Sequence, residues 1–182
     1  MDILKANAIL NNNEEIKGNN VKTYKKMFND IKEEYLDDTN FNLDTLMYEV
    51  YSYENNTPSV ENLNFGLTVL YPIYVNNECN FTKGHWHENR KCAEFYQGVS
   101  GKGLLLLMDE NGKTWSEEVH QGSIHYIDGK LAHRLVNVGD DKLVVSATWS
   151  PSAGHDYDAV KNCPFKYRIF KIDNKLIIKE RN

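Results

Sequence analysis

The chain has 182 residues, of which 41% are hydrophobic and 26% are charged. This length and composition predict one globular domain with its own apolar core and exclude an intrinsically disordered protein. The net charge of -5, without a basic stripe, excludes a general nucleic-acid-binding protein, and no apolar run is long enough to predict a membrane span.

The three cysteines, Cys79, Cys92 and Cys163, form no paired motif, and no N-terminal apolar stretch of the signal-peptide type is present. Reduced thiols in a cytoplasmic protein are therefore expected. Cys92 stands two residues before Glu94. We interpret it as a small buried residue of a strand and not as a metal ligand.

Residues 21–35 carry apolar side chains at helical spacing, with lysine and glutamate between them. The apolar positions are Val21, Tyr24, Met27, Phe28, Ile31 and Tyr35. This pattern predicts one amphipathic helix, ended by Asp37 and Asp38. The helix is expected to belong to an N-terminal extension over residues 1–45.

The rest of the chain is typical of short strands. Segments rich in Val, Ile, Tyr and Thr alternate with turn-forming Gly, Asn and Asp residues, including a polar turn at 55–58. The predicted strands cover 46–53, 63–75, 81–87, 92–99, 103–108, 114–119, 123–127, 133–138 and 143–150. Many short strands at this spacing predict an all-β sandwich or barrel over residues 46–182, in a single domain with the extension.

Two histidines separated by one residue, His85 and His87, project to the same side of a strand because strand side chains alternate. Glu94 follows them, and His133 begins a later predicted strand. Imidazole is a good ligand for Zn, Fe, Mn or Ni, and a carboxylate suits the harder ions. A barrel that brings these strands together would let the four side chains hold one divalent ion and leave positions open for a substrate.

These residues resemble the two sequence motifs of the cupin superfamily. The residues that match the first motif are Gly84, His85, His87, Glu94 and Gly101. The residues that match the second motif are Gly122, His133 and Asn137. The gap from His87 to Glu94 is longer than in most cupins, and Asp128 stands where a proline is usual. The resemblance implies a cupin-type β-barrel, which is a double-stranded β-helix or jelly roll.

Further segments, in the same order, resemble the cupin-type glucose-6-phosphate isomerases of archaea. The segments are 64–65, 68–72, 81–87, 93–94, 101–103, 132–134 and 154–157. The resemblance implies a metal-dependent aldose–ketose isomerase that interconverts glucose 6-phosphate and fructose 6-phosphate in glycolysis and gluconeogenesis. Together with the expectation of exposed β-strands, the resemblance also suggests a homodimer.

The resemblance assigns roles to particular residues. The implied metal ligands are His85, His87, Glu94 and His133, and the implied ion is Fe²⁺, with Mn²⁺, Zn²⁺ and Ni²⁺ left open. The implied substrate contacts are Thr68, Thr82, Gly84 and Tyr96, with Trp149 where the family more often has a tyrosine. The implied catalytic residues are Glu94, His155 and Tyr157, the last two in a glycine-flanked loop.

Strict alternation places Thr82 and Gly84 on the strand face opposite His85 and His87. A bulge at Gly84, or contacts made by the backbone, would resolve this conflict.

Four other charged or titratable residues have no firm role. Lys83 and Arg134 are candidates for contact with an anion, with a solvated surface position as the alternative. His120 and His125 match nothing in the family and are expected to be bystanders.

Two mechanisms remain open. In the first, Glu94 transfers a proton between C1 and C2 through a cis-enediol. In the second, the metal assists a hydride shift and Glu94 is chiefly a ligand. His155 would assist ring opening or shuttle protons in either case, because the usual pKa of imidazole lies near neutrality.

Other functions are also compatible with the sequence. Iron held by three histidines and a glutamate suits a cupin dioxygenase, although this would not explain the threonine–glycine segment. A sugar-phosphate-binding module without turnover is a second alternative, suggested by Trp149. An isomerase that acts on mannose 6-phosphate is a third.

Overall fold

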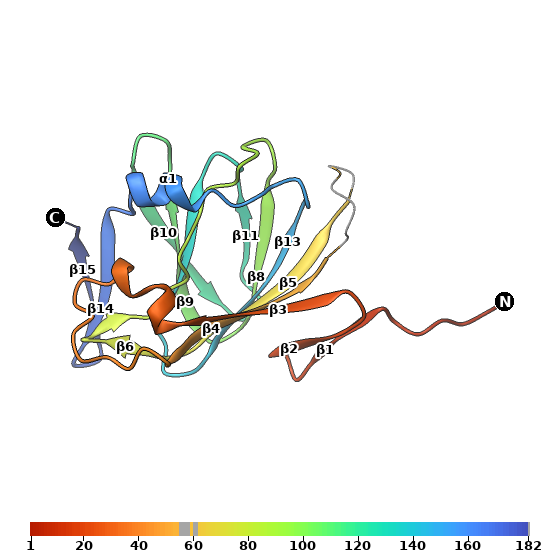
Figure 1. Cartoon of the computed structure of the whole chain (residues 1–182), viewed down its shortest axis with the longest axis horizontal. Helices are drawn as coiled ribbons and strands as arrows, with labels where there is room; N and C mark the ends of the chain where they lie inside the picture. The colour runs from red at the N-terminus through yellow and green to blue at the C-terminus, as the bar shows by residue number, and fades with distance from the viewer. Residues whose placement is uncertain (55–58, 60–61, 182) are drawn as a thin grey trace.

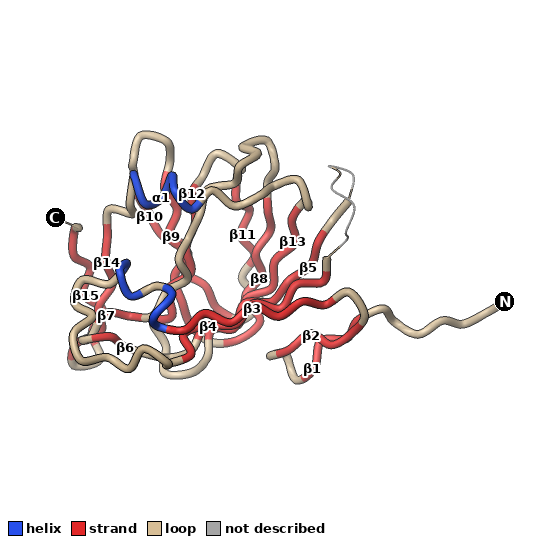
Figure 2. The backbone as a smooth tube through the Cα atoms, viewed as in Figure 1, coloured by secondary structure: helices blue, strands red, loops and turns tan. Residues whose placement is uncertain are grey.

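The computed structural model describes residues 1–54, 59 and 62–181, so the turn expected at 55–58 lies outside the described residues. Strands dominate the chain, as Figure 1 and Figure 2 show. The strands are β1 (Ala8–Asn11), β2 (Glu15–Gly18), β3 (Val21–Met27), β4 (Leu46–Tyr53), β5 (Asn64–Leu70), β6 (Tyr74–Val75), β7 (Glu78–Cys79), β8 (Glu94–Ser100), β9 (Lys102–Met108), β10 (Thr114–His120), β11 (Ile124–Ile127), β12 (Ala132–Asn137), β13 (Leu143–Trp149), β14 (Tyr167–Ile172) and β15 (Lys175–Glu180). The helices are the 3-10 helices Phe28–Asp30 and Lys32–Glu34 and the α-helix α1 (Tyr157–Asn162).

The largest sheet has the strand order β11-β8-β13-β5-β4-β3, and a second sheet has the order β10-β9-β12. The pairings within both sheets are antiparallel. Side chains from both sheets form one buried cluster that includes Leu70, Leu105, Leu135 and Val145. The core therefore lies between the two sheets, and the expected all-β barrel is confirmed.

Two smaller sheets lie beside this body. The order β15-β14-β7-β6 forms one, and the hairpin of β1 and β2 forms the other. Figure 1 shows the chain before β1 extending away from the rest of the molecule. Within the described residues, no helix is long and apolar enough to cross a membrane.

The prediction of an amphipathic helix over residues 21–35 is wrong. Val21–Met27 is strand β3, which pairs antiparallel with β4 from Val21 opposite Tyr53 to Met27 opposite Leu46. Val, Thr and Tyr favour strands, and the pairing partner, which the local spacing does not reveal, decides the structure. The next buried apolar side chains are Phe28, which begins the first 3-10 helix, and Ile31, which lies between the two 3-10 helices. The three-residue period of such helices resembles helical spacing.

Two predicted strands differ from the structure. The predicted strand 63–75 is divided into β5 and β6, and Pro72 lies between them, where it cannot donate to a sheet. Residues 81–87 form no continuous strand and instead make isolated antiparallel bridges to Val136, His133 and Asp156. Gly84 explains the interruption, because its φ of +76° is incompatible with an extended strand.

From the location of the core we expect two leucine-to-alanine substitutions to lower the free energy of unfolding by different amounts. Leu105→Ala removes a side chain that is 0% exposed and should lower the free energy of unfolding by about 3 kcal/mol. Leu176→Ala removes one that is 45% exposed and should lower it by less than about 1 kcal/mol. Urea denaturation of both variants measures the difference, and equal losses would contradict this location of the core.

Candidate metal centre

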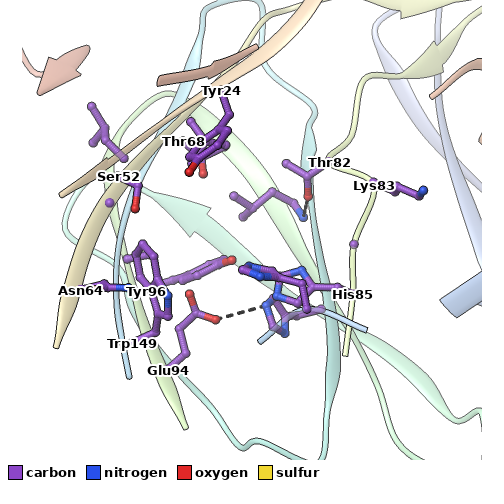
Figure 3. A pocket seen from close by; sticks show the side chains of 18 of the residues that line it. Tyr24, Ser52, Asn64, Thr68, Thr82, Lys83, His85, Glu94, Tyr96 and Trp149 are labelled. Atoms are coloured by element: carbon purple, nitrogen blue, oxygen red, sulfur yellow. Dashed lines mark hydrogen bonds and ion pairs between the residues drawn. The ribbon is translucent and has the colours of Figure 1, made fainter. Parts of the chain in front are cut away.

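The structure brings together the side chains of His85, His87, Glu94 and His133. Their ligand atoms all lie within 4.8 Å of one another. Glu94 is the first residue of β8 and His133 lies on β12, so three separate segments supply the group. Figure 3 shows the Glu94 carboxylate pointing toward the imidazole cluster.

A backbone bridge holds the histidine segment against β12. His85 N–H donates to the His133 carbonyl over 3.3 Å, and His133 N–H donates to the His85 carbonyl over 3.1 Å. The ring centroids of the two histidines are 4.3 Å apart. Gly84 permits this approach, because a Cβ there would lie 2.9 Å from the Phe165 ring and 3.0 Å from the His133 carbonyl oxygen.

Hydrogen bonds orient two of the imidazoles. His87 Nδ1 lies 2.7 Å from the Cys92 carbonyl oxygen, to which it donates, so Nε2 faces the centre, 3.1 Å from Glu94 Oε2. His133 Nδ1 lies 3.4 Å from the Leu131 carbonyl oxygen, to which it donates, and its Nε2 lies 3.2 Å from Glu94 Oε2. Such outer partners are typical of metal-ligating histidines. Cys92 is buried, as expected, and acts here through its backbone.

The donor set fits a divalent cation. His133 Nε2 is buried and makes no hydrogen bond with acceptable geometry to any described residue, although Glu94 lies close. A buried nitrogen without such a partner is costly unless another group, such as a cation, satisfies it. Three imidazole nitrogens and a carboxylate oxygen suit Fe, Mn, Zn or Ni.

The charges of the cluster also suit a cation. Burial, followed by the nearby His133 and His155, holds the pKa of His85 well below its usual range, so that its imidazole is neutral. Burial alone would raise the pKa of Glu94, but the close approach of His133 and His87 to its carboxylate lowers it to about 2. A neutral imidazole and an ionised carboxylate are the forms that bind metals.

His85, Glu94 and His133 also line a cavity of about 530 Å³. The seven other residues expected at the site from the sequence line it too: Thr68, Thr82, Gly84, Tyr96, Trp149, His155 and Tyr157. A candidate metal centre therefore opens into a space large enough for a small-molecule substrate.

Two of these residues form an aromatic wall beside the cluster. The His155 ring lies 4.3 Å from that of His85 and is stacked on Tyr157 at 5.8 Å between centroids. Burial is the main cause that lowers the pKa of His155. Tyr157 is the first residue of α1 and lies outside the expected loop, and Asp156 caps this helix by accepting from Ala159 N–H over 3.0 Å.

Strict alternation would place Thr82 and Gly84 on the face opposite His85 and His87, and the positive φ of Gly84 removes this conflict. The segment is not a regular strand, so Thr82 and Gly84 reach the same cavity as His85. His87 and His85 still converge with Glu94, although the segment that carries them lacks the expected strand structure.

Sequence reasoning missed the part of the cavity that β3 and β4 form. Lys26, Tyr48 and Ser52 line it, and none of them was a candidate. Tyr48 and Ser52 share a face of β4 by alternation, so the predicted strand 46–53 contained the pattern. Lys26 lies opposite Tyr48, inside the segment predicted to be helical.

The remaining candidates lie in different places. Lys83 lines the cavity with its amine 5.2 Å from the centre of the Tyr157 ring, whereas Arg134 is buried and does not line the cavity. His120 is exposed. His125 Nδ1 lies 2.6 Å from Glu117 Oε2, and neither His120 nor His125 lines the cavity.

Fold and site together define a cupin-type barrel protein with a candidate metal centre. The family model for Glucose-6-phosphate isomerase (GPI) matches residues 25–180, so the chain belongs to the glucose-6-phosphate isomerase family. This membership confirms the resemblance identified from the sequence motifs and the expectation that the chain is an enzyme.

Relatives of known name support the assignment. The glucose-6-phosphate isomerase of Thermococcus kodakarensis is 35% identical over 155 residues, which cover 83% of this chain and 82% of that protein. The protein of the same name from Thermococcus litoralis is 36% identical over 137 residues, covering 75% of this chain and 72% of that protein. Oxalate decarboxylase from Bacillus subtilis is a much more distant structural match, with a TM-score of 0.48 and 20% identity over 60% of this chain and 26% of that chain.

The cluster predicts specific metal binding. The protein should bind one divalent ion, and saturating ion should raise its melting temperature by several degrees, since a ligand at about 100 times its Kd stabilises by about 2.7 kcal/mol. His133→Gln should weaken binding by about 100-fold or more because it removes a buried ligand. Elemental analysis and thermal denaturation with and without ion measure both effects.

His120→Gln is the matched control, because His120 is exposed and lies outside the cluster. It should bind the ion like the unmodified protein. Equal binding by His133→Gln and His120→Gln would show that the cluster holds no metal.

Proposed function

We propose that the protein is a metal-dependent aldose–ketose isomerase that interconverts glucose 6-phosphate and fructose 6-phosphate, as in glycolysis and gluconeogenesis. The observation that carries the proposal is the cluster of three histidines and Glu94, which opens into a cavity in a chain of the glucose-6-phosphate isomerase family. Family membership favours this function over a dioxygenase or a binding module without turnover.

In this proposal the ligands are His85, His87, Glu94 and His133. The resemblance favours Fe²⁺, and the same donors suit Mn²⁺, Zn²⁺ and Ni²⁺. A bound divalent ion supplies Lewis-acid chemistry that polarises the oxygens on C1 and C2 of the open-chain sugar.

Glu94 is the proposed base. Its Oε2 is directed at His87 and His133, whereas no described residue forms a hydrogen bond or ion pair with Oε1. Glu94 also lines the cavity, so Oε1 is free to take a proton from C2 and return it to C1 on the same face of a cis-enediol. Its low pKa of about 2 keeps it ionised, as a base must be, although it also makes the base weak.

His155 and Tyr157 complete the proposed catalytic group. The pKa of His155 lies below its usual value, chiefly because the ring is buried, so the neutral imidazole can accept a proton from a sugar hydroxyl. The stacked Tyr157 holds the His155 ring against the ligand His85. We assign ring opening and proton exchange between hydroxyls to this pair.

The proposed substrate contacts are Thr68, Thr82, Gly84, Tyr96 and Trp149. Hydroxyls and backbone N–H groups are suitable donors for a phosphate. Trp149 ends β13 and its ring lies against Gly66, where a Cβ would come within 2.8 Å of it. The indole offers one N–H donor in place of the tyrosine hydroxyl that the family more often has, which makes Trp149 the residue most able to alter the choice of sugar.

The proposal includes a cytoplasmic homodimer. Unpaired cysteines throughout the described residues are compatible with a reducing compartment. The aromatic side chains of Phe95 and Tyr126 are exposed next to each other on the largest sheet, and a second subunit would cover them.

A coupled assay of fructose 6-phosphate isomerisation tests the activity. Protein stripped of metal should be inactive and should recover when one divalent ion is added. Glu94→Gln should lower kcat by at least about 100-fold, because the amide cannot act as a base. Glu117→Gln, which changes a carboxylate outside the cavity, should keep full activity. Equal activity of the two variants would exclude Glu94 from catalysis.

The fate of the transferred hydrogen tests the role of Glu94 separately. If a carboxylate carries the proton, fructose 6-phosphate converted in D₂O should yield glucose 6-phosphate with deuterium at C2, because the proton on Glu94 exchanges with solvent. Nuclear magnetic resonance of the product measures this. Complete retention of the substrate hydrogen would instead indicate a hydride shift, with Glu94 acting as a ligand.

A further inference from the structure

Arg134 is a buried cation directly behind the cavity wall. It is 4% exposed, and its guanidinium lies 4.4 Å from the centre of the Phe81 ring and 4.9 Å from that of Phe165. Its Nη2 lies 3.3 Å from Glu34 Oε2. A charge this deeply buried must be paired and hydrogen-bonded, so its position is fixed within narrow limits.

The same guanidinium binds the backbone of the turn before the histidines. Nε and Nη2 of Arg134 both donate to the Lys83 carbonyl, over 3.2 and 2.5 Å. Figure 3 shows the Lys83 side chain directed away from the other labelled residues, so the backbone is the part of Lys83 that this contact controls. Two donors from one rigid fork fix the direction of the carbonyl as well as its place.

The direction of the Lys83 carbonyl determines where the next N–H points. The two groups share one peptide plane, and in a trans peptide they point to opposite sides. Gly84 lines the cavity and Arg134 does not. With the carbonyl turned back to Arg134, the Gly84 N–H is therefore turned toward the cavity.

The Gly84 N–H differs from the neighbouring backbone N–H groups, because each of those has a hydrogen-bond acceptor within the protein. Thr82 N–H donates to the Leu135 carbonyl, Lys83 N–H to the Tyr48 hydroxyl and His85 N–H to the His133 carbonyl. For the Gly84 N–H, no acceptor exists among the residues that the structure describes. It is the donor of this turn that remains available to a ligand.

We propose that Arg134 is a positioning residue, which holds the Lys83–Gly84 peptide so that the Gly84 N–H donates to an anionic oxygen of the substrate. The inference rests on the proposed function for the identity of that anion, which is the phosphate of the sugar. Arg134 touches neither the cavity nor the substrate and acts only through the peptide.

Arg134→Lys is the informative variant. Lysine keeps the charge beside Glu34, but its single ammonium does not reproduce the two-donor fork on the Lys83 carbonyl. KM for fructose 6-phosphate and Kd for inorganic phosphate should both rise about tenfold, which is about 1.4 kcal/mol and the size of one weakened hydrogen bond to a charged group. The value of kcat and the metal content should change by less than about threefold.

Arg168→Lys is the matched control. Arg168 belongs to the same buried network, since it donates to Glu78 and to the Glu34 carbonyl over 2.8 Å, but it does not contact Lys83. It should lower the melting temperature and leave KM and Kd unchanged. Equal increases of KM in both variants would overturn the proposal and reduce Arg134 to a stabilising residue.

A measurement on the unmodified protein tests the orientation directly. In Zn²⁺-loaded, ¹⁵N-labelled protein, inorganic phosphate should shift the amide resonance of Gly84, and this decides the orientation even where Arg134→Lys fails to fold. Isomerase activity without this shift overturns the inference alone. The shift without isomerase activity overturns the proposed function alone, and absence of both overturns both.

Discussion

The antiparallel contact between His85 and His133 is the constraint on which the rest of the site depends. Two backbone hydrogen bonds make this contact, between segments 48 residues apart. Residues paired in this way point their side chains to the same face, so the pairing alone places two imidazoles side by side. His87, two residues after His85, and Glu94, at the start of β8, complete the cluster. The centre therefore rests on main-chain geometry more than on side-chain packing.

The same contact also positions Gly84, the residue that precedes His85 in the cavity wall. Gly84 lets the histidine segment approach β12, and this glycine also lines the cavity and carries the N–H that we propose as the donor to an anion. The candidate metal centre and the proposed donor to an anion are thus adjacent on a single backbone segment, at His85 and Gly84. Their separation is fixed by bond geometry, and no movement of one part of the fold against another is needed to set it. A substrate with an oxygen pair at one end and an anion at the other would meet a site already assembled.

Much of this could be predicted from the sequence, because the decisive patterns are local. The strands from Glu94 to Trp149 lie close to the segments that strand-forming residues and turn residues predict. Gly101, with a φ of +82°, joins β8 to β9 where the motif expects a glycine. The candidate ligands were also identified, since the distance of two residues between His85 and His87 keeps the rings on one side even where the segment is irregular. Alternation alone placed Thr82 on the strand face opposite His85. The positive φ at Gly84 breaks the alternation between these two residues, so both line the cavity.

What the sequence did not reveal depends on contacts between distant segments. The apolar residues of Val21–Met27 have helical spacing, and the pairing with β4 nevertheless makes the segment a strand. Arg134 illustrates the same limit for polar residues. A single arginine in a sequence is expected at the surface because burial of its charge is costly. Here Lys83 and Glu34, 51 and 100 residues away, supply the partners that make burial possible. Because each partner lies far from Arg134 in the sequence, no local pattern reveals that this arginine is paired, buried and directed at the turn before the histidines.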